Sequence, residues 1–227
     1  MAIQSLDNLR DQFKDTLDKD VKSLIRLHEK DRTSQGRPGD WLKAIRRSSI
    51  VLLAANLENY IESLVCTALE EMAKNEVKAT KYPQSYRLWL FRKIANNRNL
   101  GNVEAKDVID VSLKLYSEIR EIKQAELRID ELKDNFANPT ASNINWIIGL
   151  LDKENYLEGL ELNVNGASTS AKSALGELAT RRNEVAHGNV NQDPAIDDIQ
   201  RLSKFCQLFS TRLKKDVTTI TESILKK

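Results

Sequence analysis

The chain has 227 residues, of which 41% are hydrophobic and 30% are charged, proportions typical of a charge-rich, soluble globular protein. Its formal net charge of +2 is too small to indicate nucleic-acid binding by bulk attraction, so any basic surface has to be local. Only eight glycines and four prolines interrupt the chain, which favours long helices over a sheet protein. We therefore expect an all-α fold.

Two cysteines and one apolar run indicate the cellular location of the protein. Cys66 and Cys206 lie far apart without CxxC spacing, and no secretory signal is recognisable, so we expect buried thiols in a reducing cytoplasm. The longest apolar run, IVLLAANL at residues 50–57, is well short of the roughly 20 residues that a membrane span needs. It predicts a buried core helix and a cytoplasmic protein without membrane association.

The first predicted helix covers residues 6–29, where apolar residues recur at steps of three and four. Residues 31–40 contain Gly36 and Pro38 and predict a loop. Asp40 is a candidate N-cap for a second helix that runs from Trp41 to about residue 78. Because residues 50–57 are apolar nearly all round, this helix is expected at the centre of the core.

The middle of the chain, residues 85–138, has a weaker pattern. Helices are expected over residues 85–94 and 112–136, with a turn at residues 96–101. The whole chain, residues 1–227, is expected to form one domain that begins with a helix within residues 1–30. The middle segment is either an insert that reads a substrate or a brace for the core.

Three helices are predicted in the C-terminal third, and no strand. The first is short and ends near Leu150, and a polar loop over residues 163–170 precedes the second. The second carries RRNEVAHG, residues 181–188, and Gly188 is its expected stop because glycine adopts the left-handed conformation without a side-chain clash. The third opens with Asp193 as N-cap and proline as its first residue. Candidate caps for the first two helices are Thr140, Ser142, Ser168 and Ser170.

RRNEVAHG combines three residue types that suit phosphodiester chemistry on RNA. Asn183 and His187 lie one helical turn apart and share a face, and the long side chain of Arg182 can bend toward it. An imidazole can take the proton of a 2′-hydroxyl or give one to the leaving oxygen. A guanidinium matches the charge of a phosphoryl transition state, and no metal is required. The spacing alone is also compatible with a structural role, in which His187 interacts with the negative end of its own helix.

The phrase from Arg182 to Gly188 resembles the signature of the HEPN superfamily, an Arg, a polar residue after it, and a His a few positions later. Two further stretches resemble RiboL-PSP-type HEPN proteins: SSIVLLAANLENYIESLV, at residues 48–65, and NPTASNINWIIGLL, at residues 138–151. A long terminal helix follows the motif, as in those proteins. The resemblance is piecewise and covers residues 41–213.

This resemblance implies a bundle of four or five core helices that forms a symmetric dimer, with the motifs of both protomers at one cleft. Many members are metal-independent endoribonucleases that leave a 2′,3′-cyclic phosphate and act as bacterial toxins or antiviral effectors. His187 would be the acid or base, Arg182 would hold the phosphate and Asn183 would support both. The implied partners are RNA, a second copy of the chain and an antitoxin or regulatory protein, with no cofactor. Other members keep the fold and only bind RNA, a nucleotide or a protein.

Other residues are candidates for supporting roles. Arg181, Arg46 and Arg47 are candidate contacts to the RNA backbone, although each can equally be a solvated surface arginine. Glu58, one turn from Glu62 on the core helix, is either a paired carboxylate or a partner that holds His187 or Arg182. A second basic cluster is formed by Arg87, Arg92, Lys93 and Arg98.

The remaining histidine, cysteines and tryptophans are expected to be structural. His28 is expected at the edge of the core or on the surface, and Trp41, Trp89 and Trp146 as core or interface anchors. Two histidines and two scattered cysteines make no zinc site, so no metal is expected.

Overall fold

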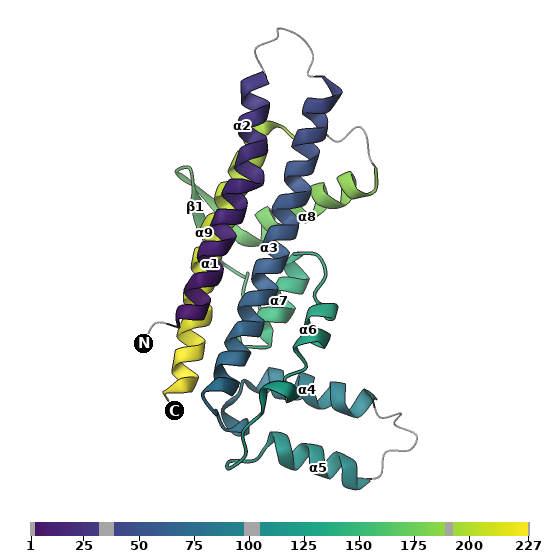
Figure 1. Ribbon diagram of the computed structural model, residues 1–227, viewed down its shortest axis with the longest axis vertical. Coiled ribbons are helices and arrows are strands. Elements are labelled where there is room, and N and C mark those ends of the chain that lie inside the picture. The colour runs from purple at the N-terminus through teal and green to yellow at the C-terminus, as the bar shows by residue number, and fades with distance from the viewer. Residues whose placement is uncertain (1–2, 32–38, 98–104, 189–192, 227) are drawn as a thin grey trace.

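A single long helix, α3 (Asp40–Lys74), forms the axis of the molecule in the computed structural model (Figure 1). The structure describes residues 3–31, 39–97, 105–188 and 193–226. Along one side of α3 lie the N-terminal helices α1 (Gln4–Lys19) and α2 (Val21–Asp31) and the C-terminal helix α9 (Ile196–Leu225). The prediction of an all-α fold is confirmed, apart from one small hairpin.

The centre of the core is the apolar part of α3, as its sequence predicts. Ile50, Leu53, Leu57, Ile61 and Leu64 are all 0% exposed. Among the described residues, α3 is the one helix long and apolar enough to cross a membrane, and half of its most apolar window is buried inside the protein. Such burial is also what the core helix of a helical bundle requires.

The N-terminal helix predicted over residues 6–29 appears as α1 and α2, which follow one another along the same line (Figure 1). The junction is at Asp20, whose N–H donates to the carbonyl of Thr16 at 2.8 Å. Helical hydrogen bonding continues there, because the N–H of Leu24 donates to the carbonyl of Asp20 at 3.3 Å. The predicted helix is therefore confirmed, with a local irregularity.

The middle of the chain departs from its prediction. Helix α4 (Gln84–Asn97) confirms the first expected helix and extends it, so part of the expected turn at residues 96–101 is helical and the rest lies outside the described residues. The helix expected over residues 112–136 is wrong. Instead, α5 (Ala105–Leu115) ends early, a turn follows in which the Ser117 hydroxyl accepts the N–H of Arg120 at 3.1 Å, and α6 (Ile129–Asn135) begins afterwards.

The polar loop expected over residues 163–170 is a β-hairpin. Strand β1 (Glu161–Val164) pairs antiparallel with β2 (Ala167–Ser170), and Asn165 and Gly166 form the turn with φ of 53° and 89°. Asn-Gly is a favoured turn for two-residue hairpins because both positions need positive φ. The prediction failed because these strands are short, polar and largely exposed.

Two predicted caps are confirmed and two are wrong. The Thr140 hydroxyl accepts the N–H of Asn143 at the start of α7 (Ala141–Gly149), and the Ser170 hydroxyl accepts the N–H of Ser173 at the start of α8 (Ala171–Ala186). Asp40 is the first residue of α3 and its carboxylate pairs with Lys43 instead of capping. Asp193 lies before the N-cap of α9, Ala195, and its carboxylate pairs with a distant arginine described below.

Candidate functional site

The motif occupies the last turns of α8, at the end that projects sideways from α3 (Figure 1). His187 is the C-cap residue, and its N–H donates to the carbonyl of Asn183 at 2.9 Å. Gly188 follows with φ of 74°, and its N–H donates to the carbonyl of Val185 at 3.1 Å. The predicted glycine stop is therefore confirmed, and it brings the motif to a helix end.

Asn183 connects the motif to the rest of the protein. Its side-chain oxygen accepts hydrogen bonds from Nη1 of Arg182 and from Nδ2 of Asn138, each at 3.1 Å. Asn138 lies before α7 with φ of 68°, a conformation that asparagine tolerates better than most residues. The main-chain oxygen of Asn138 accepts from Nδ2 of Asn143 at 3.1 Å. Asn183 is therefore oriented by two donors, and it orients Arg182 in turn.

Arg182 and Arg181 are neighbours in sequence but differ in their charge partners. Arg181 donates to Glu177 and to Asp198 of α9, each at 2.9 Å, and Arg201 donates to the same Glu177 carboxylate. Arg182 is half-buried and, among the described residues, forms no ion pair with a carboxylate. Arg181 thus ties α8 to α9, whereas the positive charge of Arg182 remains available for an anion.

His187 is exposed, and within the described ranges its imidazole makes no side-chain hydrogen bond. The structure therefore links Arg182 to Asn183 but does not orient His187 from within one chain. A catalytic imidazole is usually held by a second group that sets its orientation. That group is absent from the described part of the chain.

Arg46 does not lie at the motif. It is 6% exposed and forms a two-pronged ion pair with Asp193, in which Nε donates to Oδ1 at 2.8 Å. Its Nη1 lies 3.0 Å from Nε2 of His28, which must accept because a guanidinium only donates. His28 is 4% exposed, so it belongs to the core and not to the surface. Arg46 therefore joins α2, α3 and the segment before α9, and it is not free to bind RNA.

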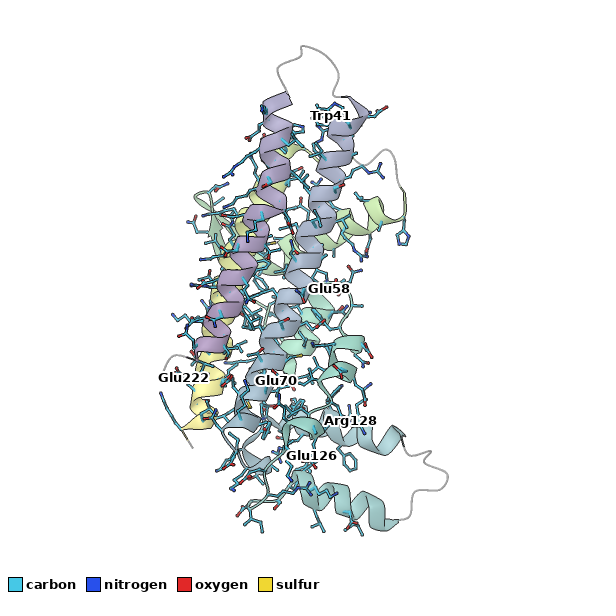
Figure 2. The ribbon with its side chains drawn as sticks, in the orientation of Figure 1. Trp41, Glu58, Glu70, Glu126, Arg128 and Glu222 are labelled. Atoms are coloured by element: carbon cyan, nitrogen blue, oxygen red, sulfur yellow. The ribbon has the colours of Figure 1, made fainter. Side chains whose placement is uncertain are left out.

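Arg47 and Glu58 are both half-buried on α3. Arg47 has no ion pair among the described residues and remains a candidate for the RNA backbone. Glu58 is labelled on α3 in Figure 2, and it has no hydrogen bond to Arg182 or His187. Burial raises the pKa of the neighbouring Glu62, with a smaller contribution from the charge of Glu58. The expected link from Glu58 to the motif is not made in one chain.

The other candidates divide between core and surface. Trp89 is 9% exposed and Trp41 is 44% exposed, so the first is a core residue and the second is not. Arg98 lies outside the described residues. Both cysteines are buried free thiols, as predicted. No group of metal-binding side chains occurs in the described part of the chain.

The sequence model of the RiboL-PSP-HEPN family matches residues 15–219. The chain belongs to this family. No curated protein and no solved structure matches the chain. The matched residues run from the last turns of α1 into α9, and membership indicates a nuclease or an RNA-binding module.

Sequence reasoning missed two features of this RiboL-PSP-HEPN protein. One is Asn138, which the sequence marks only as part of an Asn-Pro break, 45 residues from its partner Asn183. The other is the ion-pair network of Arg181 with Glu177, Asp198 and Arg201. Glu177 and Arg181 are one turn apart on a helix, a spacing that favours pairing and could have predicted the first contact.

Proposed function

We propose that the protein is a metal-independent endoribonuclease that cleaves RNA through attack of a 2′-hydroxyl on the adjacent phosphorus. The observation that supports this most is the state of Arg182. Its guanidinium is held by the Asn183 side chain, yet no carboxylate of the described chain neutralises it. An arginine that is oriented but not neutralised suits a phosphate, because its forked donors match two phosphoryl oxygens.

The reaction needs two proton transfers. As the bond from the 2′-oxygen to phosphorus forms, the hydroxyl proton passes to a base. As the bond from phosphorus to the 5′-oxygen breaks, that oxygen takes a proton from an acid. The products are a 2′,3′-cyclic phosphate and a 5′-hydroxyl, and Arg182 stabilises the negative charge on the non-bridging oxygens between these events.

One chain supplies one motif histidine for these two roles. We propose that the active form is a homodimer in which His187 of one protomer acts as base and that of its partner as acid. The exposure of His187 at the end of α8, beyond the bundle axis, is compatible with such a meeting. The proposal extends to a toxin or antiviral role with a cognate regulatory protein, which rests on the family alone.

The test is cleavage of single-stranded and transfer RNA by the purified protein in the presence of EDTA. We expect wild-type cleavage to persist with EDTA, and Arg182→Ala and His187→Ala to lose about a hundredfold or more in rate, as removal of an acid, a base or a charge stabiliser does. Light scattering of the wild type should give the mass of a dimer. Cleavage that depends on a divalent metal, or that survives in both variants, would refute the proposal.

Arg181→Ala is the matched control for Arg182→Ala. It removes the same charge one residue away, but from a side chain that Glu177 and Asp198 already neutralise. We expect it to lower the melting temperature slightly, since partly exposed ion pairs contribute up to about 1 kcal/mol, and to keep cleavage within a few-fold. Arg182→Ala should instead lose RNA cleavage and keep the melting temperature of the wild type.

RNA binding without cleavage is the second candidate function. The observation that favours it is the exposed His187, which has no orienting partner within the described part of one chain. In that case the protein would bind RNA, Arg182→Ala would weaken binding, and no cleavage product would form with any RNA.

A further inference from the structure

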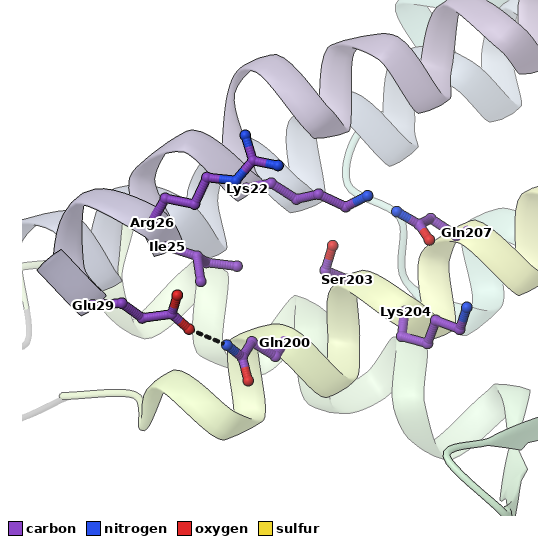
Figure 3. A pocket seen from close by; sticks show the side chains of 8 residues that line it. All are labelled: Lys22, Ile25, Arg26, Glu29, Gln200, Ser203, Lys204 and Gln207. Carbon is purple, nitrogen blue, oxygen red and sulfur yellow. Dashed lines mark hydrogen bonds between the residues drawn. The ribbon is translucent and has the colours of Figure 1, made fainter.

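A separate cavity of about 380 Å³ lies between α2 and α9 (Figure 3). Its size is near the lower end of the range for small-molecule sites. Ile25 and Ser203 form its floor and are 6% and 4% exposed. At one end, the Gln200 amide donates to the Glu29 carboxylate at 2.8 Å and joins the two helices.

Cationic side chains surround the rest of the cavity. Arg26, Lys22 and Lys204 line it, and the long side chain of Lys22 extends across the gap toward α9 (Figure 3). Lys22 is paired with Asp18 at 2.5 Å, whereas Arg26 and Lys204 form no ion pair among the described residues. Even with the charge of Glu29 counted, the lining is positive and suits an anion.

Ser203 adds a hydroxyl to the lining of the cavity. Its side chain is buried, it points into the cavity in Figure 3, and its hydroxyl makes no hydrogen bond within the described ranges. On the same helix, Thr219 and Thr221 donate to a main-chain carbonyl four residues earlier, whereas the Thr218 hydroxyl, like that of Ser203, has no partner within the described ranges. Because the Ser203 hydroxyl faces the cavity and makes no hydrogen bond within the described ranges, it can bond to a polar group that enters from outside the chain.

We propose that this cavity binds a small phosphorylated sugar. Arg26 and Lys204 would hold the phosphate, and Ser203 would donate to it or to a neighbouring hydroxyl. Glu29 and Gln200 at the far end offer acceptors and donors for sugar hydroxyls. No aromatic side chain lines the cavity, so it has no stacking surface for a nucleobase.

The cavity is distinct from the motif on α8. Ser203 and Lys204 face α2, whereas Asp198 and Arg201 of the same helix contact Arg181 and Glu177 of α8. Helix α9 therefore connects the two places, and a ligand at one would brace the helix that supports the other.

The experiment is calorimetric titration of the full chain carrying Arg182→Ala and His187→Ala, so that the motif cannot contribute and failure of the nuclease proposal does not affect the result. The probes are ribose 5-phosphate and glucose 6-phosphate, with the free sugars, inorganic phosphate and a short single-stranded RNA as comparisons. We expect saturable binding of at least one sugar phosphate, one per chain, and tighter than that of inorganic phosphate or the free sugars.

Variants of the lining residues test whether the ligand binds in this cavity. Arg26→Gln with Lys204→Gln should weaken binding at least about tenfold, and Ser203→Ala should weaken it several-fold, because each removes a hydrogen bond to a charged group. The control Lys215→Gln removes one positive charge, as Lys204→Gln alone does, from an exposed residue of α9 outside the cavity and should leave affinity unchanged.

Three outcomes would overturn the proposal. The first is no saturable binding of either sugar phosphate. The second is equal affinity for inorganic phosphate, or binding that the charge variants retain, which would show a nonspecific anion site. The third is binding of the RNA alone, lost in the charge variants, which would assign the surface to a nucleic acid.

Discussion

The ion pair of Arg46 with Asp193 gives an asymmetric prediction, because the two partners differ in burial. The Arg46 side chain is 8% exposed and that of Asp193 is 35% exposed. Asp193→Ala leaves the guanidinium charge buried, which costs roughly 3–5 kcal/mol in a fully buried pair; with partial exposure we expect about 3 kcal/mol. Arg46→Met leaves a carboxylate that water reaches and keeps much of the apolar stem, so we expect about 1.5 kcal/mol.

The double variant separates the charge effect from general damage. If the cost of Asp193→Ala comes from an unpaired buried charge, Arg46→Met with Asp193→Ala should cost about 1.5–2 kcal/mol instead of the sum of about 4.5 kcal/mol. The assay is urea unfolding followed by far-UV circular dichroism, with an unchanged dependence on denaturant as the check on two-state behaviour. Additive costs, or a cost of less than about 0.5 kcal/mol for Asp193→Ala, would refute this reasoning.

Three further predictions concern the motif, a buried thiol and the hairpin. Asn183→Asp places a carboxylate against Arg182, so RNA cleavage should fall at least about tenfold while the melting temperature stays within a few degrees; unchanged cleavage would contradict a phosphate role for this guanidinium. Burial raises the pKa of Cys66 from 9.0 to about 12, so the unfolded thiol ionises first and the free energy of unfolding should fall as pH rises from about 9 to 12. That fall should be smaller in Cys66→Ala, and identical pH profiles for the variant and the wild type would refute a contribution from Cys66. Gly166→Ala should destabilise the protein by about 1 kcal/mol in thermal melting because φ is 89°, whereas Gly176→Ala, inside α8 and with open space around it, should stabilise it by up to about 1 kcal/mol; equal effects would refute the turn assignment.

Long helices could be predicted because their apolar residues recur regularly at short sequence intervals. The apolar stretch at residues 50–57 predicts the core position of α3, and the recurring apolar residues of α9 predict most of its length. The middle of the chain could not be predicted in the same way. Leu113 and Ile119 suggest a helical stripe, but they are 64% and 86% exposed, so their spacing does not report a packed face.

The site was predictable where it depends on local spacing and not where it depends on distant contacts. The neighbours Arg182 and Asn183 are adjacent in sequence, and the structure joins them. Arg46 looks like part of a basic cluster, but its partner Asp193 is 147 residues away, so sequence alone could not show that its charge is neutralised. The contact of Asn138 with Asn183 could not be predicted for the same reason, because 45 residues separate the two in sequence.

The most direct test of the central claim is a pair of RNA oligonucleotides that differ at one atom. Both carry the sequence around a mapped cleavage position, and in one the nucleotide on the 5′ side of the scissile phosphate has hydrogen in place of its 2′-hydroxyl. With EDTA present, we predict that the wild-type protein cleaves the unmodified RNA to a 2′,3′-cyclic phosphate and leaves the modified RNA intact. Equal cleavage of both, or no cleavage of any RNA by the purified protein, would contradict the proposed chemistry of Arg182 and His187.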